Sequence, residues 1–534
     1  MSAVETTDVL VIGTGFGGAI PAYNLAAAGA KVVMLERGPE LATEDFEHSL
    51  RLGSYTRIVD LINGDGIQVV AGNCVGGSSV VYFAASLRAP SFVFERRGST
   101  GRHRLWPAAL TRSTLDPWYD RVEETLPVAQ QTWDDVPYPG GVWAAACRNA
   151  GHTCNPVPLA VDLPRCTNCN WMLMGCRFGA KRSMLLNYVP AARAHGAEVR
   201  PLHEVQSIGR AVTPGFRYRV DYSVLDAGDY RLPAGAGAIE AKIVVLAAGA
   251  MGTPVILRRS AAALGGVPDA VGRYFSPNGD RVSMALLDER RLSSVLGLRR
   301  EPDVAYEAFH IGKPIGTMSY DFLDSRRAEF ERFGLQQIYF PSITNILPED
   351  GSIADPQWFG VDKKTLSAGW RSWLTLLAMT EDDNEGRFGQ PPPNGNFVRL
   401  ASSAVLSTLT YRPNAATRRG WDLSDGVMRA IIEKDDIGRH LSWVGGQPTL
   451  SAHPLSSCRI GDDPATSALT PDHELRGSPG LFVTDGSAVP TSLTVNPSLT
   501  IAALAERSSL AIAQRAQEAG VALRTRVPTP GGNG

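Results

Sequence analysis

The sequence predicts a two-domain α/β protein in which a Rossmann-like, dinucleotide-binding domain is interleaved with a substrate-binding domain built on an antiparallel sheet. Three observations support this fold class. An apolar run ends in a glycine-rich turn at residues 9–18, similar strand endings return near 247–252 and 483–486, and alternating apolar stretches lie between them. A chain of 534 residues is also too long for one compact core. We therefore expect the first domain to be assembled from distant parts of the chain.

The first element is a buried strand followed by a turn and a helix. The run over residues 9–12 is apolar and leads into Gly13, Gly15 and Gly18, which have the spacing G-x-G-x-x-G. The first glycine of this motif allows a tight turn, and the second lets the backbone approach a pyrophosphate. The third lets the next helix pack on the strand. We expect that helix over residues 16–28.

A second apolar run, over residues 31–35, ends at Glu36 and Arg37. A carboxylate at this distance from the glycines accepts hydrogen bonds from both ribose hydroxyls and disfavours a 2′-phosphate. The sequence therefore predicts FAD or NAD as the ligand, and not NADP.

A later segment favours FAD. The apolar strand expected over residues 243–246 is followed by Ala248 and Gly249, about 200 residues after the first motif. The small residues let the chain return beside the cofactor, and the segment resembles the second flavin-contacting motif of two-dinucleotide-domain flavoproteins. A dehydrogenase that uses only nicotinamide would have completed its sheet much earlier.

The third segment of this domain lies near the C-terminus. A strand expected over residues 481–484 leads to Asp485 and Gly486, and Asn496-Pro497 then opens a helix with an apolar face.

These elements occur in the order found in the glucose-methanol-choline (GMC) flavoprotein oxidoreductases, and the chain most resembles the branch that contains the bacterial cholesterol oxidases. The resemblance rests on G-x-G-x-x-G with its acidic residue, NCVGGSSVVY at 73–82, AAGAMGTP at 247–254, HPLSSC at 453–458, VTDGS at 483–487 and NPSLTIAALAER at 496–507. It implies an FAD-dependent enzyme that oxidises the hydroxyl group of an alcohol.

The resemblance also implies a set of FAD contacts spread over the chain. These are Gly13, Gly15, Phe16, Gly18, Glu36, Arg37, Gly72, Asn73, Gly76, Gly77, Ser78, Val205, Ala248, Gly249, Asp485, Gly486, Asn496, Pro497 and Ser498. Family members that attach the flavin covalently often do so through a histidine in the loop that corresponds to 72–83. This loop contains no histidine, so we expect non-covalent FAD.

The stretch SAHPLSSCRIG holds the candidate base. The resemblance implies that His453 and Asn496 face the flavin beside the substrate hydroxyl. An imidazole suits removal of the hydroxyl proton while hydride leaves the carbon, and an amide can hydrogen-bond the same oxygen. A serine hydrolase would need a G-x-S-x-G elbow, which Ser456 and Ser457 do not have. The spacing does not exclude a Cys458/His453 nucleophile, but the resemblance implies that Cys458 is a packing residue. A purely structural His453 stays open.

One departure from the nearest relatives concerns an acid. Cholesterol oxidases use a glutamate above the flavin, whereas the corresponding stretch FGLQQIYFPS carries Gln336 and Gln337. An amide is no base, so movement of a ring double bond is expected to be impaired. Glu329, Glu331 or Glu385 could supply the acid from a shifted loop.

The seven cysteines are expected to be reduced, since the set is odd and no secretory signal is present. Cys166, Cys169 and Cys176 have the spacing C-x2-C-x6-C, with Met172 between the last two. An iron-sulfur or zinc site would need a fourth ligand from elsewhere. We predict a cysteine-rich loop packed on the core, with no metal.

The expected domain boundaries follow from these segments. The FAD domain takes residues 1–95, 190–290 and 450–523, and the substrate domain takes 96–189 and 291–449, with strands in LQQIYFPSI and WLTLLAM. Residues 390–396 are expected as an exposed turn, and 524–534 as a disordered tail.

Composition limits the partners. The chain carries 52 lysines and arginines against 54 aspartates and glutamates, which gives no sign of a nucleic-acid partner or a polybasic anchor. No leader and no long apolar run is present, so we expect a cytoplasmic protein without a stable membrane anchor. The expected partners are a bulky apolar alcohol, such as a sterol or secondary metabolite, and O2 or another electron acceptor. A non-oxidative isomerase or lyase on the same scaffold is the alternative.

Overall fold

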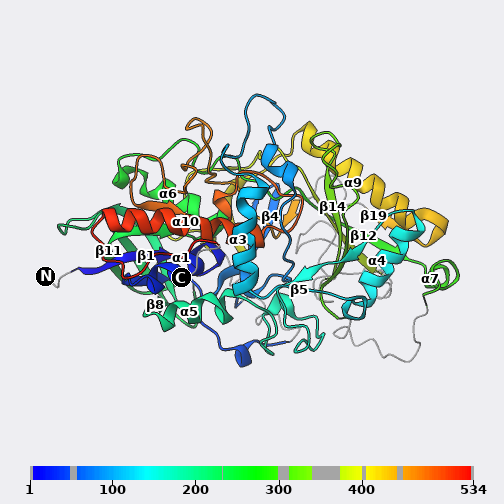
Figure 1. Cartoon of the computed structure of the whole chain (residues 1–534), viewed down its shortest axis with the longest axis horizontal. Helices are drawn as coiled ribbons and strands as arrows, with labels where there is room; N and C mark the ends of the chain where they lie inside the picture. The colour runs from blue at the N-terminus through cyan, green and yellow to red at the C-terminus, as the bar shows by residue number, and fades with distance from the viewer. Residues whose placement is uncertain are drawn as a thin grey trace.

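The computed structural model describes residues 4–48, 57–230, 232–298, 312–339, 373–399, 404–441 and 449–530. Two sheets with their helices lie side by side along the long axis, and both termini lie on the side of the first sheet (Figure 1). The confirmed fold class is mixed α/β, with a largely parallel sheet and a separate antiparallel one.

The first sheet is parallel where it holds the predicted nucleotide motifs and antiparallel at one end. In sheet order its strands are β8 (Glu198–Arg200), β2 (Val32–Leu35), β1 (Glu5–Ile12), β11 (Pro233–Leu246), β10 (Tyr218–Leu225) and β9 (His203–Arg210), with β21 (Leu481–Val483) paired to β11. The apolar runs predicted near residues 9, 31, 243 and 481 are all strands of this sheet. Their sequences are apolar without alternation because these strands are buried on both faces.

The register of these strands brings the three glycine-rich segments together. Ile12 pairs with Leu35 of β2 and with Leu246 of β11, and Leu246 pairs in turn with Val483 of β21, all in parallel. The carboxyl ends of four strands therefore meet at one edge. Ligands of open α/β sheets bind at this edge.

Helices cover the first sheet. They are α1 (Phe16–Ala27), α3 (Arg112–Thr125), α5 (Tyr188–Ala194), α6 (Gly249–Leu264) and α10 (Ser498–Glu518). Helix α1 packs against α5 and α10, and α6 packs against β9. Figure 1 shows α1, α6 and α10 gathered around β1 and β11. The helix expected after the glycine turn ends one residue earlier than predicted.

The second sheet is antiparallel. Its strands, in order, are β19 (Gly438–Leu441), β12 (Asp280–Leu287), β15 (Trp373–Thr380), β14 (Phe333–Ile338), β13 (Ile315–Ser319) and β6 (Asn155–Pro156). Helices α4 (Tyr138–Asn149), α7 (Glu289–Leu296) and α9 (Ala415–Glu433) flank it. The predicted strands in LQQIYFPSI and WLTLLAM are present as β14 and β15, while residues 340–343 lie outside the described part of the chain.

A third sheet joins segments that the sequence placed in different domains. It contains β16 (Arg387–Phe388), β18 (Ala404–Thr410), β3 (Val59–Asp65), β4 (Ile67–Gly72) and β20 (Thr449–Ser451), with β17 (Val398–Arg399) paired to β18. A short pair is formed by β5 (Ala129–Gln130) and β7 (Pro158–Leu159). Strand β20 leads directly to the SAHPLSSC stretch.

The domain boundaries stay a prediction, and two observations bear on them. Strand β12, which was expected in the FAD domain, pairs within the antiparallel sheet. The expected tail 524–534 starts with ordered residues, because the Arg524 N–H donates to the Ala28 carbonyl at 2.7 Å and Val527 is buried. Residues 531–534 lie outside the described part of the chain.

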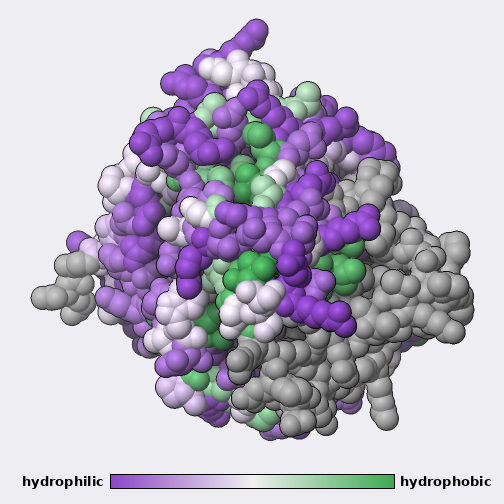
Figure 2. All heavy atoms as spheres, turned by 90° about the vertical axis from the view of Figure 1, so that its right-hand side faces the viewer, coloured by the Kyte–Doolittle hydropathy of each residue, from purple (hydrophilic) through white to green (hydrophobic). Residues whose placement is uncertain are grey.

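Among the residues that the structure describes, the surface at the end of the molecule that carries α7 and α9 is mainly hydrophilic, with several smaller apolar areas (Figure 2). Among the described helices, none has both the length and the apolar character needed to cross a bilayer.

Candidate active site

The glycine turn after β1 has the geometry of a phosphate cradle. Gly13 has φ +96°, and a Cβ there would lie 2.2 Å from the Ala247 carbonyl oxygen, so the turn admits only glycine. Gly15 has open space around it: the atom nearest to a Cβ at this position would be the Gly77 Cα, at 4.0 Å. Gly15 also begins α1, and neither a side-chain cap nor an acidic residue occupies this helix N-terminus. An open, uncapped N-terminus fits the pyrophosphate of a dinucleotide.

The loop at 72–78 closes over this turn. The Gly76 N–H donates to Thr14 Oγ1 at 2.9 Å, and the Gly72 N–H donates to Ser78 Oγ at 3.0 Å. Gly76 and Gly77 have φ of +94° and +57°. The structure thus brings the predicted loop beside the predicted turn. Its Asn73 side chain is buried, and Asn73 Oδ1 has no protein donor. A buried orphan acceptor is what a missing ligand would leave behind.

Glu36 lies at the end of β2, as predicted, and is buried. Its carboxylate accepts hydrogen bonds from Thr14 N at 3.0 Å, Thr14 Oγ1 at 2.7 Å and Gly38 N at 3.0 Å. Burial raises the pKa of Glu36, and these donors oppose that effect. A carboxylate offers about four acceptor positions, so one position is left for a ribose hydroxyl.

Arg37 takes part in a buried ion network that sequence reasoning missed. Its guanidinium contacts Asp60 Oδ2 at 2.5 Å, and Arg399 contacts both oxygens of the same carboxylate at 3.0 and 2.9 Å. Arg37 Nη1 has no protein acceptor. Val205 lies on β9, two residues after His203. The His203 N–H, at the start of this strand, donates to the Glu36 carbonyl at 2.8 Å. These residues surround the predicted ribose end of the site.

The middle and C-terminal motifs contact each other. Asp485 Oδ2 accepts from Gly249 N at 2.9 Å and from Thr253 Oγ1 at 2.5 Å, while its Oδ1 accepts from Ser487 N at 2.8 Å. Burial raises the pKa of Asp485. Ala248 precedes α6, and Gly486 starts the turn after Asp485. Both motifs therefore lie at the carboxyl edge of the sheet.

The two predicted catalytic residues are in contact. Asn496 Nδ2 lies 3.3 Å from His453 Nε2, although 43 positions separate the residues. Pro497 is the N-cap of α10 and fixes where the helix starts after Asn496. Ser498 Oγ donates to the Ala85 carbonyl at 3.1 Å, and Phe16 packs edge-on against Tyr82 at 5.6 Å.

A carboxylate orients the histidine, and the sequence did not reveal it. Asp280, at the start of β12, places Oδ1 2.9 Å from His453 Nδ1 and is 3% exposed. Ser451 Oγ donates to Asp280 Oδ2 at 2.9 Å and accepts from His453 N at 3.0 Å. Since a carboxylate only accepts, Nδ1 carries the proton. His453 Nε2 is then an acceptor for the Asn496 amide N–H.

Gln336 lies on the other side of Asn496. Its Nε2 donates to Asn496 Oδ1 at 3.2 Å, which turns the Asn496 amide nitrogen toward His453. Gln336 is fully buried, and its Oε1 has no protein donor. Gln337 Oε1 instead accepts from Gly316 N at 3.1 Å. Of the two glutamines, Gln336 is the one that contacts a predicted site residue.

In the described part of the chain, the alternative acids bind other partners than this pair. Glu329 binds Arg96, Glu331 forms an ion pair with Arg419, and Glu385 accepts from Asn414 N at 2.9 Å.

Other residues of the SAHPLSSC stretch are packed inside the protein. Cys458 is fully buried, and burial raises the pKa of its thiol, which disfavours a nucleophilic thiolate. Ser457 Oγ donates to the Ala250 carbonyl at 2.7 Å. The packing interpretation of Cys458 agrees with these contacts.

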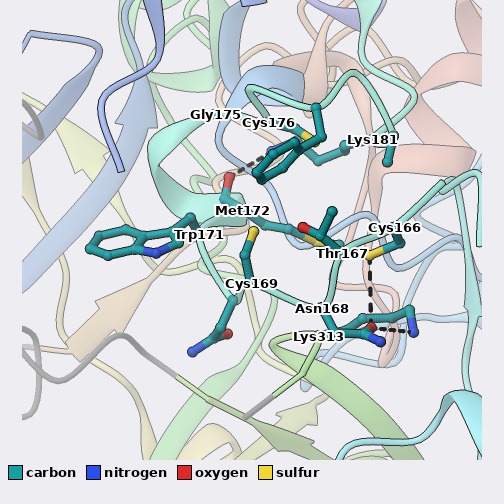
Figure 3. Close-up of a pocket in the computed structure, with 13 residues that line it drawn as sticks. Cys166, Thr167, Asn168, Cys169, Trp171, Met172, Gly175, Cys176, Lys181 and Lys313 are labelled. Carbon is teal, nitrogen blue, oxygen red and sulfur yellow. Dashed lines mark hydrogen bonds between the residues drawn. The ribbon is translucent and has the colours of Figure 1, made fainter. Parts of the chain in front are cut away.

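The cysteine loop lines a small hollow that is partly open to solvent (Figure 3). Cys166, Cys169 and Cys176 are among its lining residues, and all seven cysteines are free thiols. Within the described ranges, no three histidine, cysteine or acidic side chains cluster closely enough to hold a metal ion. Lys181 closes the base of the loop and donates to the Met172 carbonyl at 2.6 Å.

Comparison with known proteins identifies the class of this site. The family model described as GMC oxidoreductase matches over residues 7–276 in its N-terminal part and over 432–505 in its C-terminal part, together more than half of the chain. A cholesterol oxidase of Mycobacterium tuberculosis (strain ATCC 25618 / H37Rv) is 28% identical, over 94% of this chain and 90% of the relative. A 2-methyl-1,2-propanediol dehydrogenase of Mycolicibacterium austroafricanum is 26% identical, over 96% of each chain.

A solved structure supports the fold. An FAD-dependent oxidoreductase from Chaetomium thermophilum superposes with a TM-score of 0.62 at 14% identity, covering 97% of this chain and 100% of that one. The family matches confirm the predicted resemblance, and with it the enzyme class, an FAD-dependent oxidoreductase of the GMC type. The chain belongs to the GMC oxidoreductase family.

Proposed function

We propose that this chain oxidises the hydroxyl group of a bulky apolar alcohol and that His453 is the base that removes the hydroxyl proton. The observation that carries the proposal is the 3.3 Å contact between Asn496 Nδ2 and His453 Nε2. His453 Nδ1 is occupied by Asp280, so Nε2 is the nitrogen available to a substrate. The names of the two relatives, a cholesterol oxidase and a diol dehydrogenase, support an alcohol as the substrate class.

The amide of Asn496 suits the same oxygen. With its Oδ1 held by Gln336, the Asn496 Nδ2 group points to the His453 side, and a hydroxyl that replaces the direct Nδ2–Nε2 contact can accept from it. The hydroxyl would then donate its proton to Nε2 and accept from the amide. A positioned base and a donor on one oxygen favour the alkoxide that forms as the proton leaves.

We further propose that the cofactor is FAD, bound without a covalent link. Once bound, FAD supplies an acceptor for the hydride that leaves the alcohol carbon. Gly15 and Gly77 leave room for its pyrophosphate, and the Glu36 carboxylate has an acceptor position for its ribose. Acid precipitation should release all of the yellow colour into the supernatant, whereas colour retained by the polypeptide would contradict the proposal.

The decisive experiment is anaerobic mixing of the FAD-loaded protein with cholesterol, 1-hexadecanol and 2-methyl-1,2-propanediol. Oxidation predicts bleaching of the flavin band by at least one alcohol, and later admission of air shows whether O2 restores the band. An isomerised product without bleaching would favour the non-oxidative alternative.

His453→Ala tests the base. The rate of flavin reduction should fall about 10²- to 10⁴-fold, the usual contribution of a positioned general base, while FAD stays bound. His195→Ala is the control, because His195 is exposed at the end of α5. Flavin reduction at the wild-type rate in His453→Ala would show that another group is the base.

A further inference from the structure

We propose that the turn Ser276–Asp280, with the sequence SPNGD, is a positioning element that holds both His453 and Asn496, with Asp280 setting the histidine and Asn278 setting the segment that carries the asparagine. This inference rests on the proposed function of the pair and adds residues that lie outside the sequence motifs. The turn joins the first sheet's region to the start of β12, where Asp280 begins the antiparallel sheet.

The first arm of the turn reaches the histidine from two directions. Asp280 Oδ1 accepts from His453 Nδ1 at 2.9 Å, and Asp280 Oδ2 accepts from Ser451 Oγ at 2.9 Å. Ser451 Oγ in turn accepts the His453 backbone N–H at 3.0 Å. One carboxylate therefore holds the ring and the main chain of the same residue. This arrangement directs the Nδ1 proton to Asp280 and turns Nε2 toward Asn496.

The second arm reaches the asparagine segment. Asn278 Nδ2 donates to the Val495 carbonyl at 3.0 Å, and Asn278 Oδ1 accepts from Leu493 N at 2.7 Å. The Asn278 side chain is fully buried. Because the Val495 carbonyl belongs to the peptide group that joins Val495 to Asn496, these two hydrogen bonds limit where the Asn496 amide can lie.

The turn itself is held rigidly, so its two arms have a fixed relation. Asn278 and Gly279 both have left-handed backbones, with φ of 61° and 64°. A Cβ at Gly279 would lie 2.1 Å from the Thr380 carbonyl oxygen, and Thr380 N donates back to the Gly279 carbonyl at 3.2 Å. Ser276 pairs with Leu455, two residues after His453, through two main-chain hydrogen bonds of 3.0 and 2.9 Å.

Two side chains of one turn, separated only by Gly279, thus bind two segments that lie 43 positions apart and carry the proposed base and the proposed donor. The 3.3 Å contact between His453 Nε2 and Asn496 Nδ2 depends on both arms. Loss of the Asp280 arm should free the histidine ring and its tautomer. Loss of the Asn278 arm should move the amide while the tautomer stays.

The first test reads the tautomer without any substrate. The FAD-loaded protein, labelled with ¹⁵N-histidine, should show the proton of the His453 ring on Nδ1 and a hydrogen-bonded Nε2, with signals assigned by their absence in His453→Gln. Asp280→Ala should lose the Nδ1–H tautomer and slow flavin reduction by about 10²- to 10⁴-fold. Asp280→Asn keeps an acceptor for the His453 ring, so it should retain the Nδ1–H tautomer. Its flavin should be reduced at least tenfold faster than that of Asp280→Ala.

Asp425→Asn is the matched control for burial and charge. Asp425 is 6% exposed, and its carboxylate binds Arg281, the residue after Asp280, and not His453 or Asn496. It should change neither the His453 signals nor the rate beyond threefold. Preservation of the tautomer and of the rate in Asp280→Ala would overturn the role of Asp280.

Asn278→Asp tests the second arm, because aspartate tolerates the same backbone but cannot donate to the Val495 carbonyl. The Nδ1–H tautomer should stay, the Nε2 signal should shift, and flavin reduction should slow by about 10²-fold, the cost of a misplaced group. An unchanged Nε2 signal would overturn the role of Asn278. If no alcohol reduces the wild-type flavin, the proposed function fails, and the ¹⁵N signals still decide both arms.

Discussion

Replacing Gly15 or Gly18 by alanine should separate the two roles of the glycine turn, which are packing of α1 on β1 and room for the cofactor. A Cβ at Gly18 would lie 2.0 Å from the Gly13 carbonyl oxygen and 2.9 Å from its carbon. Both atoms are backbone, so α1 must move by about 1 Å to restore normal contact. Such overpacking costs about 1–3 kcal/mol, and the better helix propensity of alanine offsets up to about 1 kcal/mol of that.

Gly15→Ala should behave in the opposite way. Gly15 has φ −70° and ψ −168°, which alanine adopts freely, and the nearest atom to its Cβ is 4.0 Å away. The free energy of unfolding of the apoprotein should therefore change by less than about 0.5 kcal/mol. The added methyl group would fill the space between Gly15 and Gly77 that we assign to the pyrophosphate. FAD affinity should fall by about 1–3 kcal/mol, or 10- to 200-fold.

The assay compares both quantities on the same proteins. Urea unfolding of the apoproteins gives the free energy of unfolding, and quenching of tryptophan fluorescence during FAD titration gives Kd. Gly141→Ala in α4 is the control, because a Cβ there meets no atom within 4 Å, so this variant should be as stable as wild type or more so. A Gly18→Ala apoprotein as stable as Gly141→Ala, or a Gly15→Ala protein with wild-type Kd, would refute the reasoning.

Two further predictions concern buried charges. Lys181→Met should lower the free energy of unfolding by about 2–4 kcal/mol in urea titrations, because it removes the ammonium donor of the Val80, Tyr82 and Met172 carbonyls; wild-type stability would show that these carbonyls find other donors. Asp382→Asn should change how the free energy of unfolding depends on pH. Burial raises the pKa of Asp382 to about 7, so between pH 4 and 7 the folded protein holds a proton that the unfolded chain has lost. The stability of the wild-type protein therefore falls as the pH rises through this window. Urea unfolding at pH 5 and pH 8 should show a drop smaller by up to about 3 kcal/mol in the variant, and equal drops would contradict the raised pKa.

Sequence reasoning was most successful where chemistry depends on neighbours in the chain. The strand, turn and helix around Gly13 were predictable because apolar periodicity and glycine spacing are local properties. The same holds for Glu36 at the end of β2 and for the start of α10 after Pro497. The order of these motifs was enough to indicate the family.

Three features could not be predicted from the sequence: the third sheet, the ion network around Asp60, and the carboxylate that orients His453. Asp60 meets Arg399 across 339 positions, and Asp280 meets His453 across 173. Aspartate and arginine are common residues, and nothing in their local sequence distinguishes a buried partner from a solvated surface charge.

The sequence by itself determined which residue types stand at the ends of the strands, and so the kind of cofactor edge this chain can form. Only the tertiary structure decided that His453, Asn496 and Asp280 meet, and which ring nitrogen of His453 is left for a substrate. The physical reason is that strand pairing and turn geometry bring distant segments together. Hydrogen-bond direction and burial, which set the chemistry of a side chain, exist only after those segments have packed.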